Sequence, residues 1–203
     1  MPESGDYPGL HPDDYTNVTA LNTAYIQATL DLKGPQCGRL AAAPFLLFSL
    51  REQQLDWWQD ALADGRQGDL MEPGDILRPD VRSLQLAALS FLWQLGRRNP
   101  YAVRVVSGAT IAWCERVTRL PLITLLNRVG TRGDLLQSRL SGVTGISARL
   151  LDDGISADTD VRRSSHLAAL QTLLTQSGVE NWSRLPAAAC KMPGVLRVVD
   201  KKL

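Results

Sequence analysis

The chain has 203 residues, of which 44% are hydrophobic and 21% charged, which is typical of one globular domain with or without a small extension. It contains no apolar run of about 18 residues, and its start, MPESGDYPGLHPDD, is acidic where a signal peptide is basic and then apolar. We therefore expect a cytoplasmic protein without a membrane span. Three widely separated cysteines with no Cys-x-x-Cys pair favour reduced thiols over a disulfide framework or a structural zinc site.

The net charge of +1 is the sum of two opposite parts of the chain. Residues 1–80 hold 5 Lys+Arg and 13 Asp+Glu, a balance of −8, whereas residues 81–203 hold 17 and 8, a balance of +9. Fourteen of those 17 basic residues are arginine, which binds carboxylate and phosphate groups through paired hydrogen bonds. The asymmetry predicts that the acidic part folds against the basic part, or that the basic part binds an acidic protein or a nucleic acid.

Residues 1–16 are predicted to be an irregular leader, and residues 17–203 a single helical domain. The first predicted helix is capped by Asp14, Thr16 or Asn17 and runs to about residue 32, with an apolar stripe at Leu21, Tyr25, Ala28 and Leu32. A short helix and a buried turn follow, because Pro44 interrupts helical structure. Ser49 and Glu52 then match a capping box, which predicts a helix that ends near Gly65. Residues 64–79, rich in glycine and proline, allow a two-lobed division.

The densest apolar sequence lies in residues 80–140, and we expect the rest of the chain to pack around it. Between Asp80 and Gly96 the sequence is apolar almost all round, which predicts a central helix covered on several sides. Asn99 followed by Pro100 opens a second helix, which we expect to continue to about Arg119. A third helix follows from residue 121 to 130, and a short fourth from about 134 to 140.

The last third of the chain also shows helix signals. Residues 143–153 form a short predicted helix ended by Gly154, and Asp158 or Asp160 caps a longer helix to about Gln176. Residues 193–199 are predicted to be a short strand or an extended tail. The sequence therefore predicts an all-α fold, a compact bundle of about eight helices.

The residue types that carry common chemistry do not form a known pattern. The sequence has no G-x-S-x-G, no P-loop, no G-x-G-x-x-G and no H-E-x-x-H. His166 follows Ser164 and Ser165, but we interpret it as a solvated helical histidine. The aspartates between residues 152 and 160 are interpreted as helix caps, because their spacing differs from that of a calcium loop. We therefore predict no catalytic residue, no metal site and no cofactor.

These observations favour a non-enzymatic adaptor or regulatory protein that binds another macromolecule through its arginine-rich later part, with a protein, acidic in one version, as the expected partner and nucleic acid as the other. The residues proposed to bind this partner are Arg97, Arg98, Arg162 and Arg163. The alternative is a DNA-binding transcription regulator with a helix-turn-helix-like unit at 122–140, in which Arg132, Gln137 and Arg139 contact the nucleic acid. An enzyme with an unrecognised helical active site is a third class.

Overall fold

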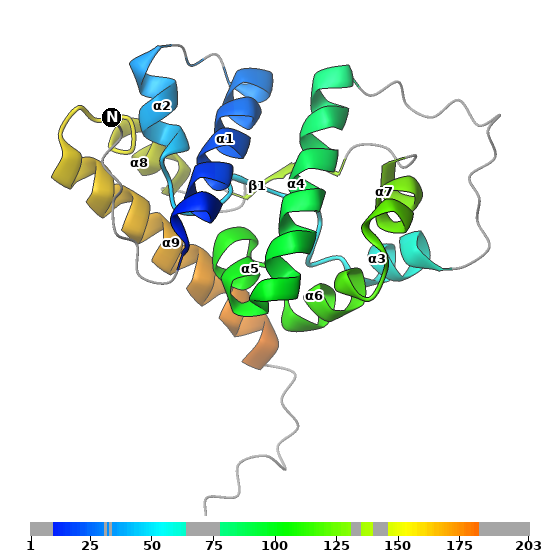
Figure 1. Ribbon diagram of the computed structural model, residues 1–203. Coiled ribbons are helices and arrows are strands. Elements are labelled where there is room, and N and C mark those ends of the chain that lie inside the picture. Colours follow the sequence, from blue (N-terminus) through cyan, green and yellow to red (C-terminus); the bar gives the residue numbers. More distant parts are fainter. Residues whose placement is uncertain are drawn as a thin grey trace, which may run out of the picture.

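The computed structural model describes residues 10–30, 32, 34–63, 78–130, 135–139 and 146–182, with side chains at 146–147 and 176–182 excepted. This part of the chain contains nine helices and one two-stranded antiparallel sheet, which confirms the predicted all-α fold (Figure 1). The elements in chain order are α1 (Pro12–Thr29), α2 (Pro35–Ala41), β1 (Phe48–Ser49), α3 (Leu55–Leu62), α4 (Pro79–Arg98), α5 (Pro100–Ser107), α6 (Ile111–Thr118), α7 (Leu122–Gly130), β2 (Gln137–Ser138), α8 (Ile146–Asp152) and α9 (Thr159–Trp182).

Helix α4 lies at the centre of the fold, as its apolar sequence predicts. It packs against α1, α5, α6 and α7, while α2 packs on α1 and α3 on α7 (Figure 1). Its buried side chains include Leu84, Leu89, Leu92 and Leu95, and burial of each leucine contributes roughly 1.5–3 kcal/mol. The core continues from Val18 in α1 to side chains of α9, so α1 to α9 share one apolar cluster.

Several helix starts follow the local chemistry of the sequence. The Asn99 side chain accepts hydrogen bonds from the backbone N–H groups of Tyr101 and Ala102, each at 3.1 Å, which confirms the predicted start of α5. Helix α1 begins earlier than predicted. Pro12 occupies its first turn, and His11 accepts from the backbone N–H of Asp13 at 3.3 Å, so the predicted irregular leader extends too far.

The predicted continuous helix from residue 99 to 119 is wrong, because two helices meet there at a corner. Gly108 ends α5 in the left-handed region, at φ 79°. Thr110 then caps α6, and its side-chain oxygen accepts from the backbone N–H of Trp113 at 3.1 Å. A glycine at the end and a threonine cap at the next start satisfy the backbone groups that a helix terminus leaves open.

Replacement of Gly108 by alanine should lower the free energy of unfolding by roughly 1–2 kcal/mol, because a β-carbon is strained in the left-handed region. Gly38 provides the matched control. It lies within α2 with open space around its Cα, so Gly38→Ala should raise stability by up to about 1 kcal/mol. Urea denaturation of both variants measures the two effects, and equal effects would contradict the assigned corner.

Residues 43–50 agree with one prediction and contradict another: a buried non-helical stretch follows the short helix α2, as predicted, but no helix opens at Ser49. We call residues 43–50 the extended segment: it crosses the interior without helix, bends at residues 44, 45 and 47, and forms strand at 48–49. Residues 43–48 are buried, and α3 begins only at Leu55. The predicted capping box is therefore wrong. β1 pairs with β2 in an antiparallel register that places Phe48 opposite Ser138, so residues 137–138 form a strand where a short helix is predicted.

Two further predictions fall largely on residues that lie outside the described part. These are the possible division at 64–79, of which only residues 78 and 79 are described, and the tail at 193–199. The predicted helices at 143–153 and 158–176 are present as α8 and α9, and α9 extends to Trp182. Among the described helices, none combines the length and apolar character that a membrane crossing needs.

Candidate functional site

A buried polar cluster holds the extended segment in the interior. Asn22, which is inaccessible to solvent, donates from Nδ2 to the carbonyl oxygens of Ala41 at 3.2 Å and Phe45 at 2.9 Å. Its Oδ1 accepts from the backbone N–H of Leu47 at 3.0 Å. These bonds replace the backbone partners that the segment would find in water, so Asn22 has a structural role.

Arg139 belongs to the same cluster. Its Nη1 donates to the carbonyl oxygens of Leu46 at 3.1 Å and Val106 at 2.7 Å, and its guanidinium lies 5.8 Å from the centre of the Phe45 ring. Burial lowers the pKa of Arg139 to about 10, and the charge of Glu52 partly opposes this effect. The guanidinium thus ties the extended segment to α5.

The helix-turn-helix-like unit is not formed as predicted. Its first helix is present as α7, but Gln137 lies in β2 and Arg139 makes the interior contacts just described, because the short sheet takes the place of the second helix. Arg132 lies outside the described residues. A major-groove reader needs a helix with polar side chains projecting from it, and the described residues 135–139 supply none.

Glu52 is a buried ionisable group whose environment the sequence did not reveal. It is 1% exposed, and its Oε2 accepts from the backbone N–H of Leu50 at 2.9 Å. Within the described part of the chain, its Oε1 has no hydrogen-bond partner. Burial raises the pKa of Glu52 to about 7, although the charge of Arg139 acts in the opposite direction. The Ser-x-x-Glu spacing concealed this buried environment, since it suggested a capping box.

His166 is buried, so the prediction of a solvated histidine is wrong. The side chain is 1% exposed, and burial lowers its pKa to about 4 despite a hydrogen bond to the backbone of Gly154. Its Nε2 has no partner among the described residues, whereas the Ser165 hydroxyl donates to the carbonyl oxygen of Arg149 at 3.4 Å. The serine and the histidine therefore do not form a nucleophile–base pair.

Two of the predicted binding arginines lie together at the end of α4. The Arg97 guanidinium stacks 4.9 Å from the centre of the Trp93 ring. Arg98 forms an ion pair of 2.6 Å with the buried carboxylate of Asp14 in α1. This pair is one point at which the acidic early part of the chain folds against the basic later part.

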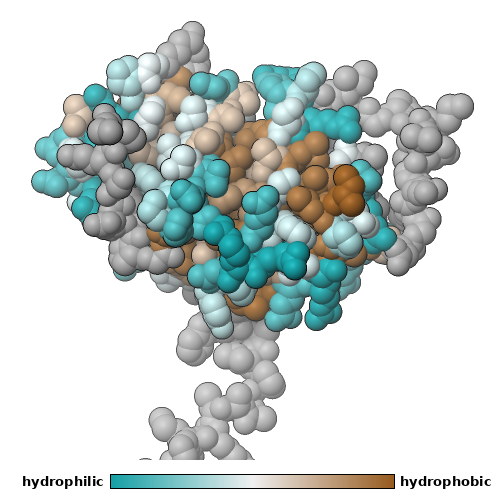
Figure 2. Space-filling model, in the orientation of Figure 1, coloured by the Kyte–Doolittle hydropathy of each residue, from teal (hydrophilic) through white to brown (hydrophobic). Residues whose placement is uncertain are grey.

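Beyond these arginines, α5 presents an exposed face to solvent. Tyr101 is 71% exposed, the highest value among the exposed large hydrophobic side chains of the described residues, and Val105 follows one turn later. Figure 2 shows hydrophilic side chains over α5 and the adjoining end of α4, beside a hydrophobic area over α4 and α7. We call the following set the α4–α5 surface: Arg97, Arg98, Tyr101, Arg104 and Val105. Residues 101, 104 and 105 face away from the buried residues 102, 103 and 106, a helical spacing readable from the sequence.

The other two predicted binding arginines, Arg162 and Arg163, are near the start of α9. Figure 1 places this end of α9 apart from the end of α4, so the four arginines do not form one surface. The Arg162 guanidinium donates to the carbonyl oxygen of Ser156 at 2.8 Å and to the Thr159 hydroxyl at 3.2 Å. It therefore closes the turn that precedes α9. Arg163 is exposed.

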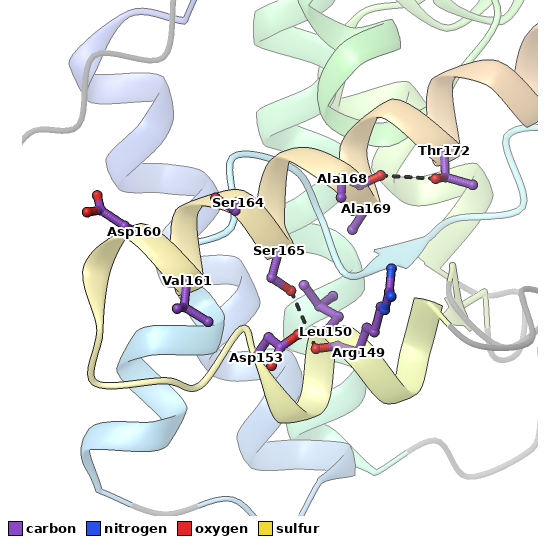
Figure 3. A pocket seen from close by; sticks show the side chains of 10 residues that line it. All are labelled: Arg149, Leu150, Asp153, Asp160, Val161, Ser164, Ser165, Ala168, Ala169 and Thr172. Carbon is purple, nitrogen blue, oxygen red and sulfur yellow. Dashed lines mark hydrogen bonds between the residues drawn. The ribbon is translucent and has the colours of Figure 1, made fainter.

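A groove of about 560 Å³ lies between α8 and α9 (Figure 3). Its floor is apolar where Leu150 and Ala169 are buried, and small hydroxyl and methyl side chains of α9 form one wall. The lining residues are Arg149, Leu150, Asp153, Asp160, Val161, Ser164, Ser165, Ala168, Ala169 and Thr172.

The described residues contain no group of three or more histidine, cysteine or acidic side chains placed to hold a metal ion. Cys37 and Cys114 are buried free thiols, and Cys190 lies outside the described part. Comparison of the chain with protein-family models, with curated proteins and with solved structures finds no match.

Proposed function

We propose that the protein is a non-enzymatic, cytoplasmic adaptor or regulatory protein that binds an acidic segment of another protein through the α4–α5 surface. The observation that carries this proposal is Tyr101, which is 71% exposed in a neighbourhood that includes Arg97 and Arg104. Tyrosine and arginine are enriched among the few interface residues that contribute most of the binding energy. An exposed aromatic ring costs little side-chain entropy on binding, and arginine pairs with carboxylates through two hydrogen bonds.

The arginines of this surface differ in their freedom to bind. Arg98 is already paired with Asp14, whereas Arg97 is held over Trp93 by a contact that leaves its N–H groups available to a carboxylate. Stacking reduces the number of conformations that the Arg97 side chain loses when a partner binds. Arg97, Tyr101 and Arg104 are therefore the residues that bind the partner, whereas Arg162 closes the turn before α9.

Photocrosslinking tests the proposal directly. A benzoylphenylalanine residue placed at position 101 should give one dominant covalent adduct in native lysate, while the same residue at the exposed position 171 of α9 should not. Addition of Arg97→Glu and Arg104→Glu should abolish the adduct, because both changes repel an acidic partner. The matched control Arg82→Glu, an exposed position in the first turn of α4, should leave it intact.

With the partner purified from that adduct, Tyr101→Ala should weaken binding at least about thirtyfold, which corresponds to a loss of roughly 2 kcal/mol. The thermal stability of the Tyr101→Ala variant should match that of the wild type, because the tyrosine ring is mostly exposed. An adduct that survives the double charge reversal, or affinity unchanged by Tyr101→Ala, would show that the protein binds elsewhere.

A further inference from the structure

Helix α9 has a second face that the described part of the chain leaves exposed or half-exposed. His166, Ala169 and Leu173 point into the core, while Val161, 42% exposed, begins a row along the groove. The row continues at helical spacing of four, seven and eleven residues through Ser165, Ala168 and Thr172. Its members after Val161 are small, so another helix could approach this face at the short end of the usual interhelical distance of about 8–10 Å.

Three charged side chains line the groove: Arg149 on α8 and Asp153 at its C-terminal end, which are not paired with each other, and Asp160 at the start of α9. Arg149 and Asp153 lie four residues apart on α8, a spacing that allows an ion pair. Within the described part of the chain, neither side chain has a hydrogen-bond or ion-pair partner. Figure 3 shows the Arg149 side chain extending away from Asp153, which leaves one stretch of the groove basic and another acidic.

Asp153 directly follows the last residue of α8, at the end of the helix where a negative charge is unfavourable. Its backbone N–H donates to the carbonyl oxygen of Arg149 at 2.8 Å, so its carboxylate is at the C-terminal end of α8. A negative charge at that end opposes the helix dipole and costs about 0.3–1 kcal/mol. The groove therefore keeps an acidic group where the helix alone would favour a basic one, and a cation supplied from outside would compensate for it.

We infer that the α8–α9 groove is a docking site for a second copy of this chain, arranged about a two-fold axis. A two-fold axis places the basic stretch of each groove opposite the acidic stretch of the other, so Arg149 of one copy meets Asp153 of the other twice in the interface. The small row of α9 packs against the same row of the second copy, with Val161 entering the facing groove. The charge pattern is complementary to itself in this arrangement.

Charge reversal and charge swap test the inference. Sedimentation equilibrium of the full chain, from about 1 μM to several hundred micromolar, should show a monomer–dimer equilibrium. Arg149→Asp and Asp153→Arg should each weaken dimerisation at least about tenfold, because each change creates two like-charge contacts. The double variant R149D/D153R should return to within about threefold of the wild type, since the swap restores both contacts. The distant reversal Arg82→Asp serves as the control and should leave dimerisation unchanged.

The variants should remain folded, so a weaker dimer can be attributed to the interface. Arg149 and Asp153 are both exposed, and Asp153→Arg favours the dipole of α8, so the monomer of this variant should be at least as stable as the wild type. Ala168→Gln supplies a steric variant, which keeps a good helix former at an exposed position but fills the groove, and it should also weaken the dimer at least about tenfold. A protein that stays monomeric at every concentration would overturn the inference, and so would a dimer that the reversals leave intact or that the swap fails to restore.

Discussion

Replacement of Asn22 by alanine should lower the free energy of unfolding by at least about 4 kcal/mol. The Asn22 amide donates to the carbonyl oxygens of Ala41, Ala43 and Phe45, and its oxygen accepts from the backbone N–H of Leu47. All of these groups are buried, and each unsatisfied one costs about 1–3 kcal/mol. A domain of this size has a total stability of roughly 5–15 kcal/mol, so the variant should be close to unfolding at 37 °C.

Asn17 in the same helix provides the control for this experiment. Asn17 is exposed, so Asn17→Ala removes no buried hydrogen bond and should change stability by less than about 0.5 kcal/mol. Urea denaturation followed by circular dichroism compares the two variants with the wild type. If Asn22→Ala loses less than about 1 kcal/mol, the extended segment must find other partners, and the role assigned to the asparagine is wrong.

The helices of this protein are readable from its sequence where their signals are local. The Asn99-Pro100 start and the apolar residues of α4 predict observed elements, because capping and helical periodicity depend on neighbours within one or two turns. The corner at Gly108 was also present as a local signal. A glycine followed two residues later by threonine combines an end and a start, but the valines before it and the apolar spacing after it suggested one helix.

The buried polar cluster was not readable, because its contacts join distant parts of the chain. Arg139 and Leu46 are 93 residues apart, and no local pattern marks an arginine that will satisfy an interior carbonyl. Glu52 was misread because its spacing from Ser49 fits a capping box, and His166 because polar residues precede it in α9. In each case tertiary packing decides the environment, so the shifted pKa values of Glu52 and His166 could not be predicted from the sequence.

These two groups should control how stability depends on pH. Burial raises the pKa of Glu52 from 4.5 to about 7, so the folded protein retains a proton that the unfolded chain releases. Its contribution to stability is complete below pH 4.5 and is lost as the pH rises to 7. Burial lowers the pKa of His166 from 6.5 to about 4, so its contribution is complete above pH 6.5 and is lost as the pH falls to 4. Each displacement corresponds to roughly 3 kcal/mol.

Between pH 4.5 and 6.5, Glu52 makes the free energy of unfolding fall with rising pH and His166 makes it rise, so the two contributions should largely cancel in the wild type. Variants that lack one of the two groups should show each contribution separately. Relative to the wild type, Glu52→Gln should gain about 3 kcal/mol of stability as the pH rises from 4.5 to 7, because the variant has no carboxyl proton to release. His166→Gln should lose about the same amount, relative to the wild type, between pH 4 and 6.5. The double variant should differ from the wild type by an amount that is nearly constant between pH 4.5 and 6.5, since both slopes are removed. Urea unfolding at intervals from pH 4 to 8 measures these differences. If the free energy of unfolding depends on pH in the same way for the wild type and both single variants, the pKa shifts assigned to Glu52 and His166 are wrong.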